Sequence, residues 1–445
     1  MMRGTNSPQR ATNSSNEVRH ERSTGILPVG QPGVSPGESL FGRRDARRPR
    51  SRDDSATAAG SMIYLDYNAT TPLCNDAREA MLPYFDQHFG NPSSVHAAGR
   101  EARAAIDDAR DKLAALLRVK PHELIFTSGG TESCNLAVLG LARCPSSRGG
   151  HVISNKAEHH AVLNALEYLE KREKFEVTWL NVSRDGIVDL DQLASAIRTE
   201  TRLVSIMTAN NETGGIQPMR EISQICRDRG VLLHSDMVQS FGKIDIDISL
   251  VDAASFAAHK FYGPKGAGLL FLRSGLSVQP IMFGGAHENE RRPGTENVAA
   301  IAGMASAAEW TLRDRQVEQK REAQLRDELW TRIAGTFPAA NQNGDSARRL
   351  GNTLNVSFPG FDSETTLMAL DLEGVCASSG SACMVGSVVA SHVLIAMGLP
   401  MERASSAVRF SLGKQTTAKE IDDAAKAIER IVGRLMKANS AYAVG

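Results

Sequence analysis

Lys260 is the residue whose surroundings point most directly to chemistry. It lies in the stretch AAHKFYGPKG, residues 257–266, between His259 and the turn residues Gly263 and Pro264. Burial disfavours the charged form of a lysine, and a neutral amine can form an imine with an aldehyde. Lys260 is therefore a candidate to hold pyridoxal phosphate, although such a segment in isolation is also typical of a surface turn.

The elements that must position this lysine are predicted by alternating apolar runs and amphipathic stretches. This alternation predicts an α/β fold in which helices flank a mainly parallel sheet. Ligands bind such sheets beyond the carboxyl ends of the strands, so polar residues placed directly after a strand are the first site candidates. The expected strands cover residues 123–127, 151–154, 175–180, 203–207, 231–235, 253–256 and 268–272, and the clearest expected helices cover 99–118 and 189–197.

Four further groups of polar residues follow these expected strands. Gly130 and Thr131 open a helix, where backbone N–H groups favour phosphate. Asp236 could keep a pyridine nitrogen protonated, while Gln239 donates to the phenolic oxygen of the same ring. His159 could stack on a planar cofactor and move protons near neutral pH.

Asn211, the fourth, could bind a cofactor oxygen or a substrate carboxylate. Each of these residues also has an ordinary interpretation, as part of a turn, a helix cap or a solvated histidine. Together with Lys260 they share one expected edge of the sheet, and this shared position favours a cofactor site.

Cys383 is a candidate nucleophile. It lies in SSGSACMVGS, residues 378–387, and a thiolate on such a Ser- and Gly-rich loop could swing towards a substrate and away again. A bystander thiol in a linker is the alternative. Arg409, flanked by apolar residues in AVRFSLG, could clamp a carboxylate bidentately or form a structural ion pair.

Composition favours small-molecule chemistry. The chain of 445 residues is 41% hydrophobic and 23% charged with a net charge of zero, which gives no reason to expect nucleic acid or a membrane as partner. Its six cysteines are scattered and form no C-x-x-C pair, so we expect no metal site and no disulfide framework. A reducing cytoplasm is the expected location.

Four regions are expected along the chain. Residues 1–61 are rich in Ser, Pro, Gly and Arg and are predicted to be disordered. Residues 62–75 are expected to join a small domain, residues 76–310 to form a large cofactor-binding domain, and residues 311–445 to form a smaller α/β C-terminal domain with the Cys383 loop. Within the last third we expect a long helix or helix pair over 295–333, a strand in NTLNVSF and a closing helix over 419–436.

The chain resembles the cysteine desulfurases of the NifS/IscS group, which are fold-type I pyridoxal phosphate enzymes. The resemblance runs from Ile63 nearly to the C-terminus, in YLDYNATTP, FGNPSSVH, FTSGGTESCNLA, EHHAV, NNETGGIQP, AAHKFYGPKG, RRPGTEN, SSGSAC and VRFSLG. It implies that Lys260 carries the cofactor, that His159 stacks on its ring, and that Asp236 pairs with the ring nitrogen. It further implies cofactor contacts from Gly130, Thr131, Asn211, Gln239 and His259, contact from Thr295 with the neighbouring subunit's phosphate, and binding of the substrate carboxylate by Asn211 and Arg409.

The implied reaction converts L-cysteine to L-alanine in a homodimer and leaves the sulfur on Cys383 as a persulfide. Lys260 would remove the α-proton, and His159 would handle protons near the thiol. The acceptors would be iron–sulfur scaffold or tRNA-thiolation proteins. A selenocysteine lyase or related lyase, or a scaffold without activity, are the alternatives.

Ala257 departs from the family pattern, which has a Ser or Thr hydroxyl at this position. Cofactor binding should be weaker by about one charged hydrogen bond, ~1.5–3 kcal/mol.

Overall fold

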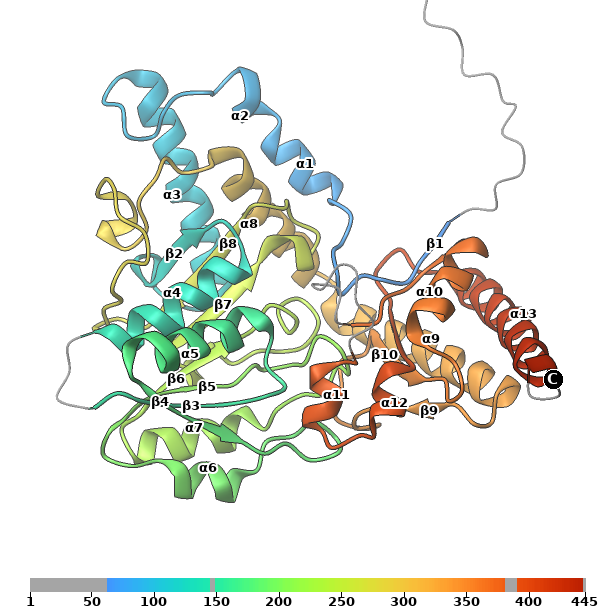
Figure 1. Ribbon diagram of the computed structural model, residues 1–445. Helices are drawn as coiled ribbons and strands as arrows, with labels where there is room; N and C mark the ends of the chain where they lie inside the picture. Colours follow the sequence, from blue (N-terminus) through green and yellow to red (C-terminus); the bar gives the residue numbers. More distant parts are fainter. Residues whose placement is uncertain (1–61, 145–148, 381–389, 443–445) are drawn as a thin grey trace, which may run out of the picture. The chain divides into compact units, whose positions relative to one another are not determined.

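The computed structural model describes residues 62–144, 149–380 and 390–442, with side chains through residue 436. The predicted disorder of residues 1–61 and the loop position of Cys383 lie outside these residues. A seven-stranded sheet forms the centre of the larger part of the fold (Figure 1). Strand β8 runs antiparallel to its two neighbours, and the other pairs are parallel. In spatial order the strands are β2 (Leu124–Thr127), β8 (Gly268–Leu272), β7 (Ala253–Ala257), β6 (Leu232–Asp236), β5 (Thr201–Ser205), β3 (His151–Asn155) and β4 (Glu176–Leu180).

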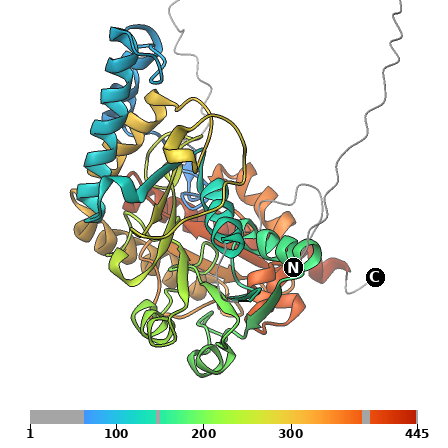
Figure 2. The ribbon, with the colours of Figure 1, turned by 90° about the vertical axis from the view of Figure 1, so that its left-hand side faces the viewer.

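Apolar residues on both faces of this sheet explain why helices cover it on two sides. Neighbouring residues of a strand point to opposite faces, so Val152 packs with one cluster and Ile153 with the other. Helices α4 (Gly130–Arg143) and α5 (His160–Glu173) contribute to the cluster of Val152. The other face is covered by α3 (Ala97–Leu117), α6 (Leu190–Ala196), α7 (Met219–Asp228) and α8 (Val298–Leu312), as Figure 2 shows from a second side. The predicted α/β class with a mainly parallel, helix-flanked sheet is confirmed.

A third apolar cluster, separate from the two that cover the central sheet, surrounds the three-stranded sheet β12-β10-β9. Strand β1 (Ile63–Tyr64) joins this part of the fold by pairing with β11 (Val375–Cys376). We propose, as the sequence predicts, a large domain over residues 76–310 and a small one over residues 62–75 and 311–445. The remaining strands are β9 (Asn341–Gln342), β10 (Thr353–Ser357) and β12 (Ala407–Ser411), and the helices here are α9 (Arg315–Thr336), α10 (Ser363–Leu372), α11 (His392–Ala396), α12 (Met401–Ser405) and α13 (Ala418–Tyr442).

Residues 295–333 form a helix pair rather than one long helix, because the chain breaks between α8 and α9 at Arg313 and Asp314. Two short helices, α1 (Asn75–Met81) and α2 (Pro83–Asp86), precede α3 and pack against α8. Among the described helices, none has the length and apolar character needed to cross a membrane.

Candidate active site

An open pocket of about 300 Å³ lies where the carboxyl ends of β2, β7, β6, β5 and β3 meet. The end of each of these strands contributes a side chain or backbone group to its lining, as expected for a parallel sheet. The pocket also receives Arg409 from β12 and two residues that follow β1. Its lining is Asn68, Ala69, Gly130, Thr131, His159, Ala161, Met207, Ala209, Asn211, Asp236, Val238, Gln239, Ala257, His259, Lys260, Gly380 and Arg409.

Lys260 enters the pocket from a short 3-10 helix, Ala258–Lys260, that follows β7 directly. Its Nζ donates to the backbone carbonyls of Asn68 and Ala69, each at 2.7 Å. The turn behind it is tight, since Tyr262 has a φ of 66° and a Cβ at Gly263 would lie 2.8 Å from the Cβ of Ala258. The direction of the Lys260 side chain is therefore fixed at its amine by these hydrogen bonds and at its backbone by the tight turn.

The start of α4 offers backbone donors at one end of the pocket. The residue before this helix is Gly129, which has no side chain that could cap the first N–H groups. A Cβ on Gly130 would lie 2.8 Å from Val238 and 3.3 Å from Ala257, so only glycine allows this close approach. His259 lies at the same end, and burial lowers the pKa of its imidazole to about 4, with Lys260 adding to the shift. A neutral His259 and a helix start suit an anion such as phosphate.

Asp236, 7% exposed, ends β6 and lies deep in the pocket. Its Oδ1 accepts a hydrogen bond from the Val238 amide at 2.9 Å, but within the described part of the chain it forms no salt bridge. Burial raises the pKa of this carboxyl, while His159 and Lys260 oppose the rise. A cationic partner placed in the pocket would stabilise its carboxylate form.

His159 precedes α5 and presents one defined ring nitrogen to the pocket. Its Nδ1 accepts the backbone N–H of Ala161 at 3.1 Å, and burial lowers the pKa of the ring. A neutral imidazole whose Nδ1 accepts carries its proton on Nε2. The ring can thus stack on a planar group and exchange a proton at Nε2.

Arg409 is 3% exposed and is held by two acceptors. Its Nη2 donates to Asp66 Oδ1 at 2.8 Å and its Nη1 to the backbone carbonyl of Asn211 at 3.0 Å. Its buried Nε has no hydrogen-bond partner in the described residues. Nη1 and Nη2 each carry a second N–H, and a guanidinium that lines a polar pocket is suited to a carboxylate.

The structure brings together nine of the eleven residues that the sequence nominates. Thr295 is exposed and is not in the pocket lining, and Cys383 lies outside the described residues, though Gly380 near it lines the pocket. Sequence reasoning missed Asn68 and Asp66. Both lie in YLDYNATTP, where two polar residues separated by Tyr67 interrupt a strand-like segment, and this interruption was the available signal.

The sheet, its strand order and the lysine at its carboxyl edge define the class as fold-type I enzymes. Residues 63–423 match the aminotransferase class-V family. The chain is 46% identical over 375 residues to the cysteine desulfurase IscS of Dictyoglomus turgidum, covering 84% of this chain and 95% of the relative.

Two solved structures are also similar. One is a NifS-like protein with a TM-score of 0.79 and 36% identity, covering 84% of this chain and 99% of its own. The other is SspA in complex with cysteine, with a TM-score of 0.70 and 34% identity, covering 78% of this chain and 98% of its own. The chain therefore belongs to the class-V aminotransferase family and, within it, to the cysteine desulfurases, as its motifs indicate.

Proposed function

We propose that this protein is a pyridoxal phosphate-dependent cysteine desulfurase that converts L-cysteine to L-alanine and passes the sulfur to Cys383. The observation that supports this most strongly is the convergence of Lys260, Asp236, His159 and Arg409 on one pocket. An amine, a buried carboxylate, a neutral imidazole and a guanidinium are the groups that such a reaction needs.

The pocket fits pyridoxal phosphate at both ends. The start of α4 with Gly130 and Thr131, together with His259, would hold the phosphate. At the other end, the buried carboxyl of Asp236, which forms no salt bridge with the described residues, would be paired with a protonated ring nitrogen. His159 would cover the ring, and Gln239 and Asn211 would contact its oxygen. When bound, the cofactor would supply an aldehyde for imine formation and an electron sink for the substrate's α-carbon.

The chain's own groups then divide the work. Arg409 and Asn211 bind the substrate carboxylate and orient the amino acid. Lys260 would remove the α-proton at Nζ. Asp236 keeps a proton on the ring nitrogen, and His159 exchanges protons at Nε2. The Cys383 thiolate attacks the substrate sulfur: an S–S bond forms, the Cβ–S bond breaks, and its electron pair remains on the carbon that, once protonated, becomes alanine.

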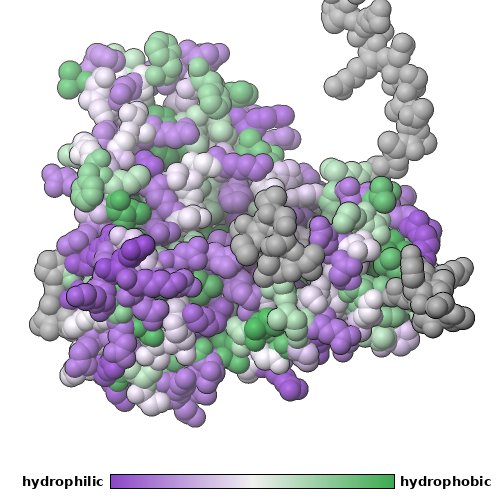
Figure 3. Space-filling model, viewed as in Figure 1, coloured by the Kyte–Doolittle hydropathy of each residue, from purple (hydrophilic) through white to green (hydrophobic). Residues whose placement is uncertain are grey.

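A second copy of this chain is the proposed partner of the site. Phe89, Val95 and Phe283 are 76%, 89% and 92% exposed, and exposed apolar surface rimmed by polar residues is typical of a protein–protein interface. Figure 3 shows apolar surface among polar residues over the part of the fold that α2 and α3 form. A homodimer formed through these residues would cover them and bring Thr295 to the partner's cofactor.

The proposed physiological partners are sulfur acceptors, either an iron–sulfur scaffold or a tRNA-thiolation protein. We propose a cytoplasmic location, because a persulfide carrier needs reduced thiols and the five cysteines of the described residues are free.

The direct test incubates cofactor-loaded protein with L-cysteine without oxygen and measures alanine and intact mass. We expect alanine release and one added sulfur atom. Alanine with free sulfide and no added sulfur would indicate a lyase instead, and faster turnover of selenocysteine would favour a selenocysteine lyase. Protein that neither turns over nor binds the cofactor would be the scaffold.

Replacing Ala257 with serine should tighten cofactor binding about tenfold or more, because a hydroxyl would add a hydrogen bond to the phosphate. Ala257 is 2% exposed and lines the pocket beside Gly130. Dissociation constants from fluorescence titration of apoprotein measure the effect. Ala257→Val adds bulk without a hydroxyl, and an equal gain in this control would mean that packing, not the hydrogen bond, is responsible.

Replacing Arg409 with lysine should raise KM for L-cysteine about 10- to 100-fold. The guanidinium contacts Asp66 and Asn211 and still has N–H groups for a carboxylate, whereas a single ammonium cannot make all of these contacts. Steady-state alanine release measures KM and kcat separately. Arg430→Lys, at a 55% exposed ion pair, is the control. An unchanged KM in Arg409→Lys would exclude this residue as the carboxylate site.

A further inference from the structure

Lys243 lies behind the pocket, in the turn after β6, and is not among the residues that line it. Its Nζ donates to Gln239 Oε1 at 2.5 Å and to Asn68 Oδ1 at 2.8 Å. The turn depends on Gly242, which has a φ of 78° and at which a Cβ would overlap Thr311 of α8. The backbone geometry of this turn thus directs Lys243 towards Gln239 and Asn68, which lie beside Lys260.

These contacts fix the orientation of the Gln239 amide. An ammonium group can only donate, so the Gln239 atom that faces Lys243 must be the oxygen. The Nε2 atom then points the other way and donates one hydrogen to the Asn68 carbonyl at 2.9 Å. Its second hydrogen is left for the pocket, which Gln239 lines. The two contacts favour the same orientation, and without Lys243 only the Asn68 carbonyl would oppose reversal of the amide, which would turn an acceptor towards the pocket.

Asn68 extends the same network to Lys260. Its backbone carbonyl accepts from both Gln239 Nε2 and Lys260 Nζ, and its side-chain oxygen accepts from Lys243 and, at 3.1 Å, from Asn352. The two lysine amines are therefore separated by one residue, Asn68, which contacts both. Lys243 thus contacts the side chain of the residue whose carbonyl holds Lys260.

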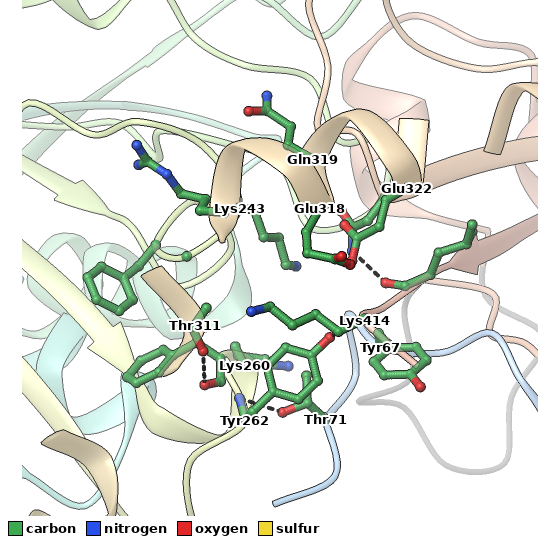
Figure 4. A pocket seen from close by; sticks show the side chains of 16 residues that line it. Tyr67, Thr71, Lys243, Lys260, Tyr262, Thr311, Glu318, Gln319, Glu322 and Lys414 are labelled. Carbon is green, nitrogen blue, oxygen red and sulfur yellow. Dashed lines mark hydrogen bonds between the residues drawn. The ribbon is translucent and has the colours of Figure 1, made fainter. Parts of the chain in front are cut away.

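A second cavity surrounds these amines on the side away from the pocket. Figure 4 shows the Lys243 and Lys414 side chains pointing into it, with Glu318 and Glu322 of α9 opposite. Burial lowers the pKa of Lys243 to about 7; Glu322 opposes this shift, while Lys260 and Arg409 add to it. Burial likewise raises the pKa of Glu322 to about 8, with Lys243 opposing and Glu318 adding. The other charged or titratable groups that line this cavity are Arg315, Tyr67 and Tyr262.

We propose that Lys243 is a positioning residue of the active site: it turns the Gln239 amide so that an N–H faces the cofactor's phenolic oxygen, and it places positive charge next to Lys260. Both effects favour the deprotonated forms of the cofactor's phenolic oxygen and of the nitrogen of Lys260. Both contributions are present while Lys243 is protonated, because only the ammonium form carries the charge and is restricted to donating. The inference rests on the proposed function, because it concerns the cofactor held on Lys260.

The test compares the pH titration of the visible absorbance of cofactor-loaded protein in wild type and Lys243→Met. Methionine keeps the side-chain length but removes the charge and the donors. We expect the titration midpoint to rise by about one pH unit, because one positive charge nearby and one fixed donor are lost. Lys243→Arg, which retains both, should keep the wild-type midpoint, and so should Lys112→Met, which removes an exposed lysine of α3.

The outcomes separate this inference from the proposed function. Wild-type protein that develops no visible absorbance with the cofactor would overturn both. Normal absorbance in all variants with the wild-type midpoint in Lys243→Met would overturn the role of Lys243 alone. A rise of the midpoint in Lys243→Met but not in Lys243→Arg, with equal thermal stability, supports it. If Lys243→Met does not fold, Lys243→Leu, which also lacks the charge and the donors, takes its place with the same expected rise.

Discussion

Replacing Lys260 with alanine should abolish alanine formation, with a loss of at least about 10³-fold, because one side chain serves both as the imine-forming amine and as the base that removes the α-proton. Lys260 is the one lysine that the described residues contribute to the pocket lining. Lys243 is not placed to replace it, since its amine donates to Gln239 and Asn68 from outside the pocket.

Two measurements check this expectation. Alanine release gives the loss of turnover, and the absorbance of the protein after addition of pyridoxal phosphate reports the missing imine. The matched control is Lys265→Ala, five positions further along the same turn and exposed, which should retain activity and absorbance. If Lys260→Ala still formed alanine at a comparable rate, another amine would have to hold the cofactor, and the assignment of the site would be wrong.

The fold could be predicted from local pattern because its strands are short apolar runs with clear ends. All seven strands predicted for the central sheet are present, with ends that differ by at most two residues. The direction of β8 could not be predicted, because GLLFL is apolar on both faces and its pattern does not distinguish a parallel from an antiparallel strand. The break between α8 and α9 was also not resolved by the pattern, since Arg313 and Asp314 are polar residues that a helix surface accepts equally well.

The site was predictable where its residues directly follow a strand, and not where they arrive from elsewhere in the chain. His159, Asp236 and Lys260 share an edge because parallel strands end together. Asn68 contacts residues 143 to 343 positions away, and its amide joins the Asn211 carbonyl to the Thr353 hydroxyl. No local period encodes such contacts. Lys243 was missed for the same reason: its partners depend on a turn conformation set by Gly242.

The second large effect is expected at Cys383, where replacement by serine should abolish sulfur transfer. A hydroxyl is far less acidic than a thiol and cannot form a persulfide, so the substrate sulfur has no acceptor on the protein. Intact mass after incubation with L-cysteine should show one added sulfur in wild type and none in Cys383→Ser. Cofactor absorbance should be unchanged, since none of the proposed cofactor contacts involves this residue.

Cys376 provides the matched control, because it lies seven positions before Cys383 and belongs to a strand. It belongs to β11, beside Tyr64 of β1, and burial raises the pKa of its thiol, which disfavours the nucleophilic thiolate. Cys376→Ser should therefore acquire sulfur as wild type does. Loss of the added sulfur in Cys376→Ser with retention in Cys383→Ser would transfer the carrier role to the strand. Alanine formation at the wild-type rate in Cys383→Ser, with sulfide released, would show that sulfur leaves this pocket without a protein carrier.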